Sequence, residues 1–230
     1  MDRETEQCQG PDRRRLLAVS CGATFGLLMH RMALGASSQK AGQEFVETTC
    51  PTNARPAKRV LIAYASRYGS TGTVAGAIAE ALCGMGHQVD VRLVNTVKEL
   101  TPYQAAIVGS AIYMGKLLPE AADFVKANQD ALGRLPTAYF VVCMTMKDDT
   151  PQNRAKATAY LDPVRQEAHK VKPVAIGLFP GVVDFSKMSF MHKAMLKTMG
   201  SAEGDYRDFP AVKRWSSDAN SKLLTAPGER

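Results

Sequence analysis

The sequence lacks the residue patterns that mark most metal sites and hydrolytic active sites. Its five cysteines show no metal-ligand spacing, and its histidines are scattered, so we assign no role to His87, His169 or His192. No Ser/His/Asp set and no pair of carboxylates is recognisable. Any catalysis would therefore depend on a bound cofactor rather than on side chains alone.

Three cysteines lie outside the first 36 residues. Cys83 falls in a predicted helix and Cys143 ends a predicted buried strand, so we expect both to be inert thiols of the core. Cys50 lies in a polar stretch, where it would be free or paired with another chain.

The start of the chain lacks a hydrophobic run long enough to span a bilayer. Residues 16–29 carry no charge, but these fourteen residues fall short of the roughly 20 that a spanning helix needs. Arg13-Arg14-Arg15 precedes this run and Ala33-Leu34-Gly35-Ala36 follows it, as in an export signal. Two arginines before a leucine pair resemble a twin-arginine signal. Residues 1–36 are thus predicted to direct export to the periplasm or cell envelope.

Two alternatives to this cleaved export signal remain open. The segment can instead be a cytosolic N-terminal helix, or a leader that is retained as a loose membrane anchor. Residues 37–58 are polar, contain two prolines and show no sustained period, so we interpret them as a linker. A domain is predicted at residues 59–224, followed by a tail at residues 225–230.

Apolar runs alternate with segments of helical period across the predicted domain. Strands are expected at residues 60–65, 88–94, 105–112, 137–143 and 173–179, the second of them at an edge of the sheet. Helices are expected after the first strand, ending near residues 84–86, and at residues 117–132, 151–167 and 208–224. This order predicts an α/β fold, a doubly wound five-stranded parallel sheet with helices on both faces. Ligands of such sheets bind beyond the carboxyl ends of the strands, where the strand order reverses.

The chain is organised around the first predicted strand, the loop Ser66-Arg67-Tyr68-Gly69-Ser70-Thr71 and the helix that follows it. The first turn of a helix has unpaired N–H groups and a dipole that favours an anion. The loop has no second glycine of a G-x-G-x-x-G motif and no P-loop lysine, which disfavours nicotinamide and ATP sites. We predict a phosphate cradle of hydroxyls and backbone amides, although the same residues can serve only as helix caps.

This loop resembles the Thr-x-Thr-Gly-x-Thr phosphate loop of flavodoxins, with Ser66, Tyr68, Gly69 and Thr71 at the patterned positions. Tyr68 departs from the usual threonine. Over about residues 59–216 the chain more closely resembles flavodoxin-domain proteins related to the menaquinone-dependent protoporphyrinogen dehydrogenases. The resemblance implies a flavodoxin-like fold, a redox function, and an FMN cofactor with its phosphate on this loop.

Two further loops are expected to contact the flavin ring, because they follow the third and fourth strands. The predicted contacts are Ala111, Ile112, Tyr113, Met114, Gly115, Met144 and Thr145. Tyr113 is the preferred neighbour of the isoalloxazine, since its ring can stack, although it can instead merely cover the core. The loop after the fourth strand lacks the aromatic residue of many carrier flavodoxins. One face of the ring would then be open to a substrate or covered by a methionine.

Residues 186–200 depart from short flavodoxins. On a helical wheel they place four methionines on one face, beside a narrower polar stripe with two lysines: Met188, Met191, Met195 and Met199, and Lys193 and Lys197. Such a helix can lie on a membrane or bind a partner, which would give access to a membrane quinone. The alternative is that its apolar face packs on its own domain.

The positive net charge favours some of the remaining candidate functions and disfavours others. The net charge is +7, and it is +6 without residues 1–36, which hold five basic and four acidic residues. Flavodoxins that act as diffusible carriers are generally acidic, whereas positive charge favours an anionic membrane or an acidic substrate such as a porphyrin with propionates. The basic residues are dispersed and no recognition motif is present, which disfavours nucleic acid.

We therefore expect an FMN-binding redox protein in which flavin N5, and no side chain, carries the chemistry. Twin-arginine transport moves folded proteins, which agrees with loading FMN before export. The first hypothesis is a quinone-linked dehydrogenase, with Arg67 as an additional charge near the phosphate. The second is an electron carrier serving a protein partner in the envelope, and the third is a flavin-free interaction module.

Overall fold

The computed structural model describes residues 45–50, 58–198 and 201–224. The predicted export signal, most of the predicted linker, the tail and Met199 lie outside the described residues. None of the described helices is both long and apolar enough to cross a membrane.

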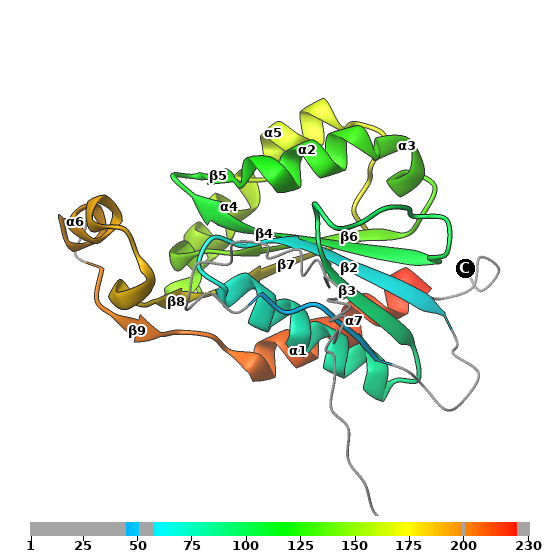
Figure 1. Cartoon of the computed structure of the whole chain (residues 1–230), viewed down its shortest axis with the longest axis horizontal. Helices are drawn as coiled ribbons and strands as arrows, with labels where there is room; N and C mark the ends of the chain where they lie inside the picture. The colour runs from blue at the N-terminus through cyan, green and yellow to red at the C-terminus, as the bar shows by residue number, and fades with distance from the viewer. Residues whose placement is uncertain (1–44, 51–57, 199–200, 225–230) are drawn as a thin grey trace, which may run out of the picture. The chain divides into compact units, whose positions relative to one another are not determined.

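Five parallel strands form the centre of the domain, as predicted (Figure 1). They are β2 (Arg59–Ala65), β3 (Gln88–Leu93), β4 (Ala105–Tyr113), β6 (Thr137–Val142) and β7 (Ala175–Phe179). Their spatial order is β3-β2-β4-β6-β7, so the order reverses between β2 and β4. This reversal is the switch point at which a ligand is expected.

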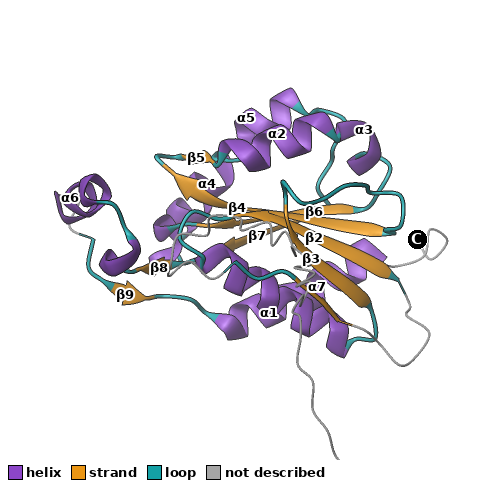
Figure 2. Ribbon diagram, viewed as in Figure 1, coloured by secondary structure: helices purple, strands orange, loops and turns teal. Residues whose placement is uncertain are grey.

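Helices cover both faces of this sheet (Figure 2). One face carries α1 (Ser70–Gly84) and α7 (Phe209–Leu224), and the other carries α2 (Pro119–Ala127), α3 (Gln129–Leu132), α4 (Pro151–Ala159) and α5 (Asp162–Glu167). Side chains of β2 alternate between two cores: Ile62 packs with α1 and α7, whereas Leu61 packs with α2 and α5. Burial on both faces explains why the strands are nearly continuous apolar runs.

Two helices predicted as single segments are each divided. Residues 117–132 form the end of β5 (Lys116–Leu117), α2 and α3, and the break falls at Asn128, whose side-chain amide donates to the Phe124 carbonyl at 2.9 Å. Residues 151–167 form α4 and α5, and α5 begins with Pro163 in its first turn. A proline N has no hydrogen to donate, so it suits the start of a new helix.

The residues interpreted as a linker contribute a strand, β1 (Thr48–Cys50), which pairs antiparallel with β3. The prediction that residues 88–94 form an edge strand was therefore wrong. Thr49 donates to the Asp90 carboxylate at 2.7 Å, and the Tyr64 hydroxyl donates to the Val46 carbonyl at 3.0 Å. Asp90 is buried, which alone would raise its pKa, but its hydrogen bonds, led by that from Thr49, hold the pKa below its usual value.

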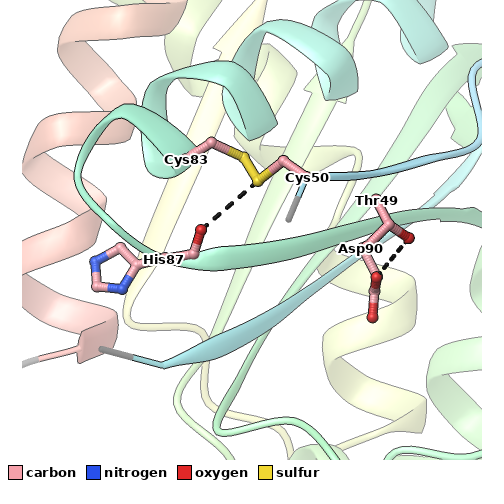
Figure 3. Close-up of a disulfide and its surroundings, with 5 residues drawn as sticks. All are labelled: Thr49, Cys50, Cys83, His87 and Asp90. Atoms are coloured by element: carbon pink, nitrogen blue, oxygen red, sulfur yellow. Dashed lines mark hydrogen bonds between the residues drawn. A yellow bond between two sulfur atoms is a disulfide. The ribbon is translucent and has the colours of Figure 1, made fainter. Parts of the chain in front are cut away.

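A disulfide joins β1 to the end of α1 (Figure 3). It links Cys50 to Cys83, with their Cα atoms 6.4 Å apart. This corrects two expectations, that Cys50 is free or paired with another chain and that Cys83 is an inert thiol. Cys143 is a buried free thiol, as predicted, and burial raises its pKa. The disulfide was missed because Cys83 follows Cys50 by 33 positions and nothing in the sequence between them indicates that β1 returns to α1.

The chain makes an excursion between β7 and α7, beyond the carboxyl ends of the strands (Figure 1). It contains β8 (Val182–Val183), the 3₁₀ turn η2 (Phe185–Lys187), α6 (Phe190–Thr198) and β9 (Gly204–Asp205). We call residues 182–205 the arm. The helix predicted at residues 186–200 is thus shorter, and a turn precedes it.

Candidate functional site

A cavity of about 460 Å³ lies at the switch point, within the size range of small-molecule sites. Its walls come from the loops after β2 and β7, from the ends of β4 and β6 with the loops that follow them, from the residue after α4, and from the arm. Of the predicted contacts, the residues that line it are Arg67, Tyr68, Ser70, Ala111, Ile112, Tyr113, Met114, Gly115, Met144 and Thr145. Ser66, Gly69 and Thr71 are not among the lining residues.

The loop after β2 leaves the start of α1 open to a ligand. Gly69 precedes the helix in a left-handed conformation, with φ of 91°, and no side chain caps the first turn. Ser66 accepts from the Gly69 amide at 3.0 Å, so its hydroxyl orders the loop. The Ser70 side chain borders the cavity. The buried Thr71 hydroxyl has no hydrogen-bond partner in the described part of the chain.

Unpaired polar groups beside an uncapped helix start suit an anion. Buried hydroxyls normally have a hydrogen-bond partner, so the isolated Thr71 hydroxyl indicates that a ligand supplies the missing one. Gly181, in the loop after β7, closes this corner: a Cβ there would lie 3.0 Å from Val142 and 3.4 Å from the Ser70 hydroxyl. A side chain at this position would press on Val142 but would make only an ordinary contact with Ser70.

The loop after β4 turns back sharply at the cavity. Met114 and Gly115 have positive φ angles of 51° and 75°, and Tyr113 pairs with Lys116 across this hairpin. Met114 is 71% exposed, so its side chain does not cover the core. On the opposite wall, the Thr145 hydroxyl lies 3.0 Å from the hydroxyl of Tyr160. Tyr160, which follows the last residue of α4, supplies the aromatic side chain that the loop after β6 lacks, and no sequence pattern singled it out.

His192 of α6 is the main residue of the site that sequence reasoning missed. Its Nδ1 is hydrogen-bonded to the Tyr68 hydroxyl and its Nε2 to the Tyr113 hydroxyl. The imidazole also meets the Tyr113 ring edge-on, with centroids 4.5 Å apart. One side chain of the arm thus joins the loop after β2 to the end of β4. No sequence signal could have found it, because 79 residues separate it from Tyr113.

A positive charge lies beside these rings. The Arg67 guanidinium carbon is 4.1 Å from the centroid of the Tyr113 ring and 5.9 Å from that of Tyr68, within cation–π range. Burial of His192, and then the charge of Arg67, lower the pKa of this imidazole below its ordinary value. His192 is therefore neutral at neutral pH, and Arg67 is the cation that an anionic ligand would meet in this cavity.

The flavodoxin domain family matches residues 61–209, more than half of the chain. The chain belongs to this family. Among curated relatives it is 23% identical to a protoporphyrinogen IX dehydrogenase [quinone] of Leishmania major over 74% of this chain and 78% of that protein. It is 24% identical to the enzyme of the same name from Escherichia coli K12, over 70% of this chain and 91% of that protein.

Solved flavodoxins are also similar to the chain. Flavodoxin 1 from Bacillus cereus has a TM-score of 0.47 and 17% identity, covering 72% of this chain and 99% of that one. A Fusobacterium nucleatum flavodoxin mutant bound to flavin mononucleotide has a TM-score of 0.41 and 13% identity, covering 72% of this chain and 97% of that one.

Membership of the flavodoxin domain family indicates a flavin cofactor, and the cavity fits one. The uncapped start of α1, where Ser70 borders the cavity, offers an anion site at one end, and the unpaired Thr71 hydroxyl lies in the same first turn. Apolar side chains of the loops after β4 and β6 and of the arm line the rest, with Tyr113 and Tyr160 among them. A flat, largely apolar ring with a phosphate at one end matches both parts of this site.

Proposed function

We propose that this protein is an FMN-dependent oxidoreductase that delivers electrons to a quinone, with menaquinone as the expected acceptor. The observation that carries the proposal is the anion site at the start of α1, with its unpaired Thr71 hydroxyl, at one end of an aromatic-lined cavity. The names of the two relatives support electron delivery to a quinone, since both are quinone-linked dehydrogenases of protoporphyrinogen IX. A reduced porphyrin is therefore the expected substrate class.

Each part of the site has a separate role in this proposal. Ser70, Thr71 and the first amides of α1 would hold the FMN phosphate by charge-assisted hydrogen bonds. Tyr113, Tyr160 and the methionines that line the cavity would bury the ring and exclude water. Bound FMN supplies the hydride and electron chemistry at its N5 atom. Arg67 would attract an acidic substrate or the phosphate itself.

Stopped-flow oxidation of the reduced, FMN-loaded protein tests the acceptor. We expect a water-soluble menaquinone analogue to reoxidise the flavin in a single two-electron phase, faster than a one-electron acceptor does at equal driving force. Fast reaction with the one-electron acceptor, and none with the quinone, would instead identify an electron carrier that serves a protein partner in the envelope.

The arm offers a surface for the membrane that holds the quinone. Phe190 and Met191 are 85% and 80% exposed, although large apolar side chains are normally buried. Lys193 and Lys197 lie on the same helix, and residues 186–198 contain no acidic side chain. We propose that this face of α6 rests on a bilayer of anionic lipid, because lysines beside exposed apolar side chains match its headgroups and acyl region.

The expected methionine face is only partly realised. Met188 lines the cavity, whereas Met191 points to solvent, so these two residues do not share one buried face. The inward side of α6 instead carries His192 and Leu196. Solvent exposure of Met191 leaves it available for the proposed bilayer contact.

Sedimentation with lipid vesicles checks the bilayer contact. We expect the protein to bind vesicles that contain phosphatidylglycerol, and Phe190→Ser with Met191→Ser to lower the partition coefficient by about tenfold or more, since each buried apolar side chain contributes about 1.5–3 kcal/mol. Val174→Ser, at another exposed apolar position (38% exposed), serves as the control and should bind like the wild type. Equal binding of the double variant would remove α6 from the membrane contact.

We also propose export through the twin-arginine route. The Cys50–Cys83 disulfide supports it, because disulfides persist mainly in oxidising compartments outside the cytoplasm. Arg13→Lys with Arg14→Lys should leave the precursor in the cytoplasm, whereas Arg15→Lys should be processed normally. Cell fractionation followed by immunoblotting compares the size and location of the precursor and of the processed protein in the two variants. Normal processing of the double variant would contradict this route.

A further inference from the structure

The base of the arm is fixed by backbone contacts. β8 and β9 pair antiparallel, with Val182 opposite Asp205 and Val183 opposite Gly204. The Phe185 amide donates to the Glu203 carboxylate at 2.9 Å just beyond this pair. The two ends of the arm are therefore held together where they leave the domain, and the position of α6 depends on other contacts.

The helix at the tip of the arm has few attachments. Figure 1 shows α6 apart from the helices that cover the two faces of the sheet. Within the described residues, the hydrogen bonds from α6 side chains to elements outside the arm are both made by His192. This residue is 6% exposed, whereas its neighbour Met191 is 80% exposed. The burial of one polar side chain on an otherwise exposed helix indicates that it holds the helix in place.

We propose that His192 is the positioning residue that fastens α6 over the cavity as its outer wall. His192 and Leu196, four residues apart on α6, and Met188, which precedes this helix, all line the cavity, so the inward side of the arm completes the site. The inference deepens the proposed function, because it assumes that this cavity holds FMN. In this inference the arm helps to retain the cofactor, in addition to any contact that it makes with a partner.

An imidazole suits this attachment better than other side chains. A neutral imidazole donates at one nitrogen and accepts at the other, and a tyrosine hydroxyl can take either complementary role. Both tyrosines are therefore satisfied whichever tautomer is present. Because Tyr68 belongs to the loop proposed to hold the phosphate and Tyr113 to the loop proposed to hold the ring, the attachment also fixes both loops relative to one another.

Two measurements on His192→Phe test the attachment. Phenylalanine keeps a ring at this position but removes both hydrogen bonds. We expect trypsin to cleave the apoprotein after Lys193 and Lys197 about tenfold faster than it cleaves the wild type, because the two hydrogen bonds of His192 no longer hold the arm closed. FMN should likewise leave the loaded variant about tenfold faster, measured by the recovery of its fluorescence. Met191→Gln, one position earlier and exposed, should match the wild type in both.

The outcomes separate this inference from the proposed function. Unchanged trypsin cleavage and unchanged FMN release in His192→Phe would overturn the role of His192. A wild type that takes up no FMN would overturn the proposed function, while the cleavage rates of the apoprotein would still decide the role of His192. If circular dichroism shows that His192→Phe does not fold, the test then uses Tyr68→Phe and Tyr113→Phe, each of which removes one of the two hydrogen bonds. Both variants should be cleaved faster than the wild type. No increase in either variant would contradict the inference.

Discussion

Replacing Ser70 and Thr71 together with alanine is expected to weaken FMN binding by about a hundredfold or more. The Ser70 side chain borders the cavity at the uncapped start of α1, and the Thr71 hydroxyl is buried there without a protein partner. Hydrogen bonds to a charged group contribute about 1.5–3 kcal/mol each, and every 1.4 kcal/mol is a factor of ten in affinity. Fluorescence titration of the apoprotein with FMN measures the effect.

The stability of the same variant distinguishes a binding role from a structural one. Since the Thr71 hydroxyl is unsatisfied, removing it should not destabilise the apoprotein and can even stabilise it. Thr73→Ala is the matched control, because Thr73 lies in the same turn of α1 and donates to the Ser70 carbonyl, outside the lining of the cavity. It should bind FMN with nearly wild-type affinity. Undiminished affinity in the double variant would refute the phosphate site.

Reducing the Cys50–Cys83 disulfide is expected to lower the free energy of unfolding by about 3–4 kcal/mol, the loop-closure value for cysteines 33 residues apart. The bond restricts the unfolded chain and keeps β1 on β3, where Thr49 reaches the buried Asp90. Urea unfolding with and without dithiothreitol, followed by circular dichroism, measures the difference.

Cys50→Ala provides the control for the reductant. It should unfold at the lower urea concentration of the reduced wild type and should not respond to dithiothreitol. Cys143 is a free thiol with no disulfide for dithiothreitol to reduce, and its burial and raised pKa disfavour its attack on the Cys50–Cys83 bond in the folded state. Identical unfolding of the oxidised and reduced wild type would show that this bond does not stabilise the domain.

The parallel sheet and the loops at its switch point could be predicted because their signals are local. Each central strand is buried on both faces, so its sequence is a short apolar run, and β2 is the clearest case. The loop from Ser66 to Thr71 is likewise marked by small and hydroxyl residues between a strand and a helix. The strand order of a doubly wound sheet then predicts that the loop after β4 lies beside this loop.

The parts that could not be predicted depend on contacts between distant segments. β1 has three residues, too few for a periodic pattern, and it is held by Asp90 and Cys83, which follow it at a distance. His192 resembles any other histidine until the arm brings it between Tyr68 and Tyr113. The methionines of α6 were more conspicuous than His192 in the sequence, although Met191 faces solvent.

Equilibrium titration of the apoprotein with FMN and, separately, with riboflavin tests the central claim most directly. The two ligands share the ring and differ in the phosphate, so their ratio of affinities reports the anion site at the start of α1 alone. We expect one FMN to bind per chain, with riboflavin weaker by about a hundredfold or more. Equal affinity for the two ligands, or no binding of FMN, would contradict a phosphate-anchored flavin in this cavity.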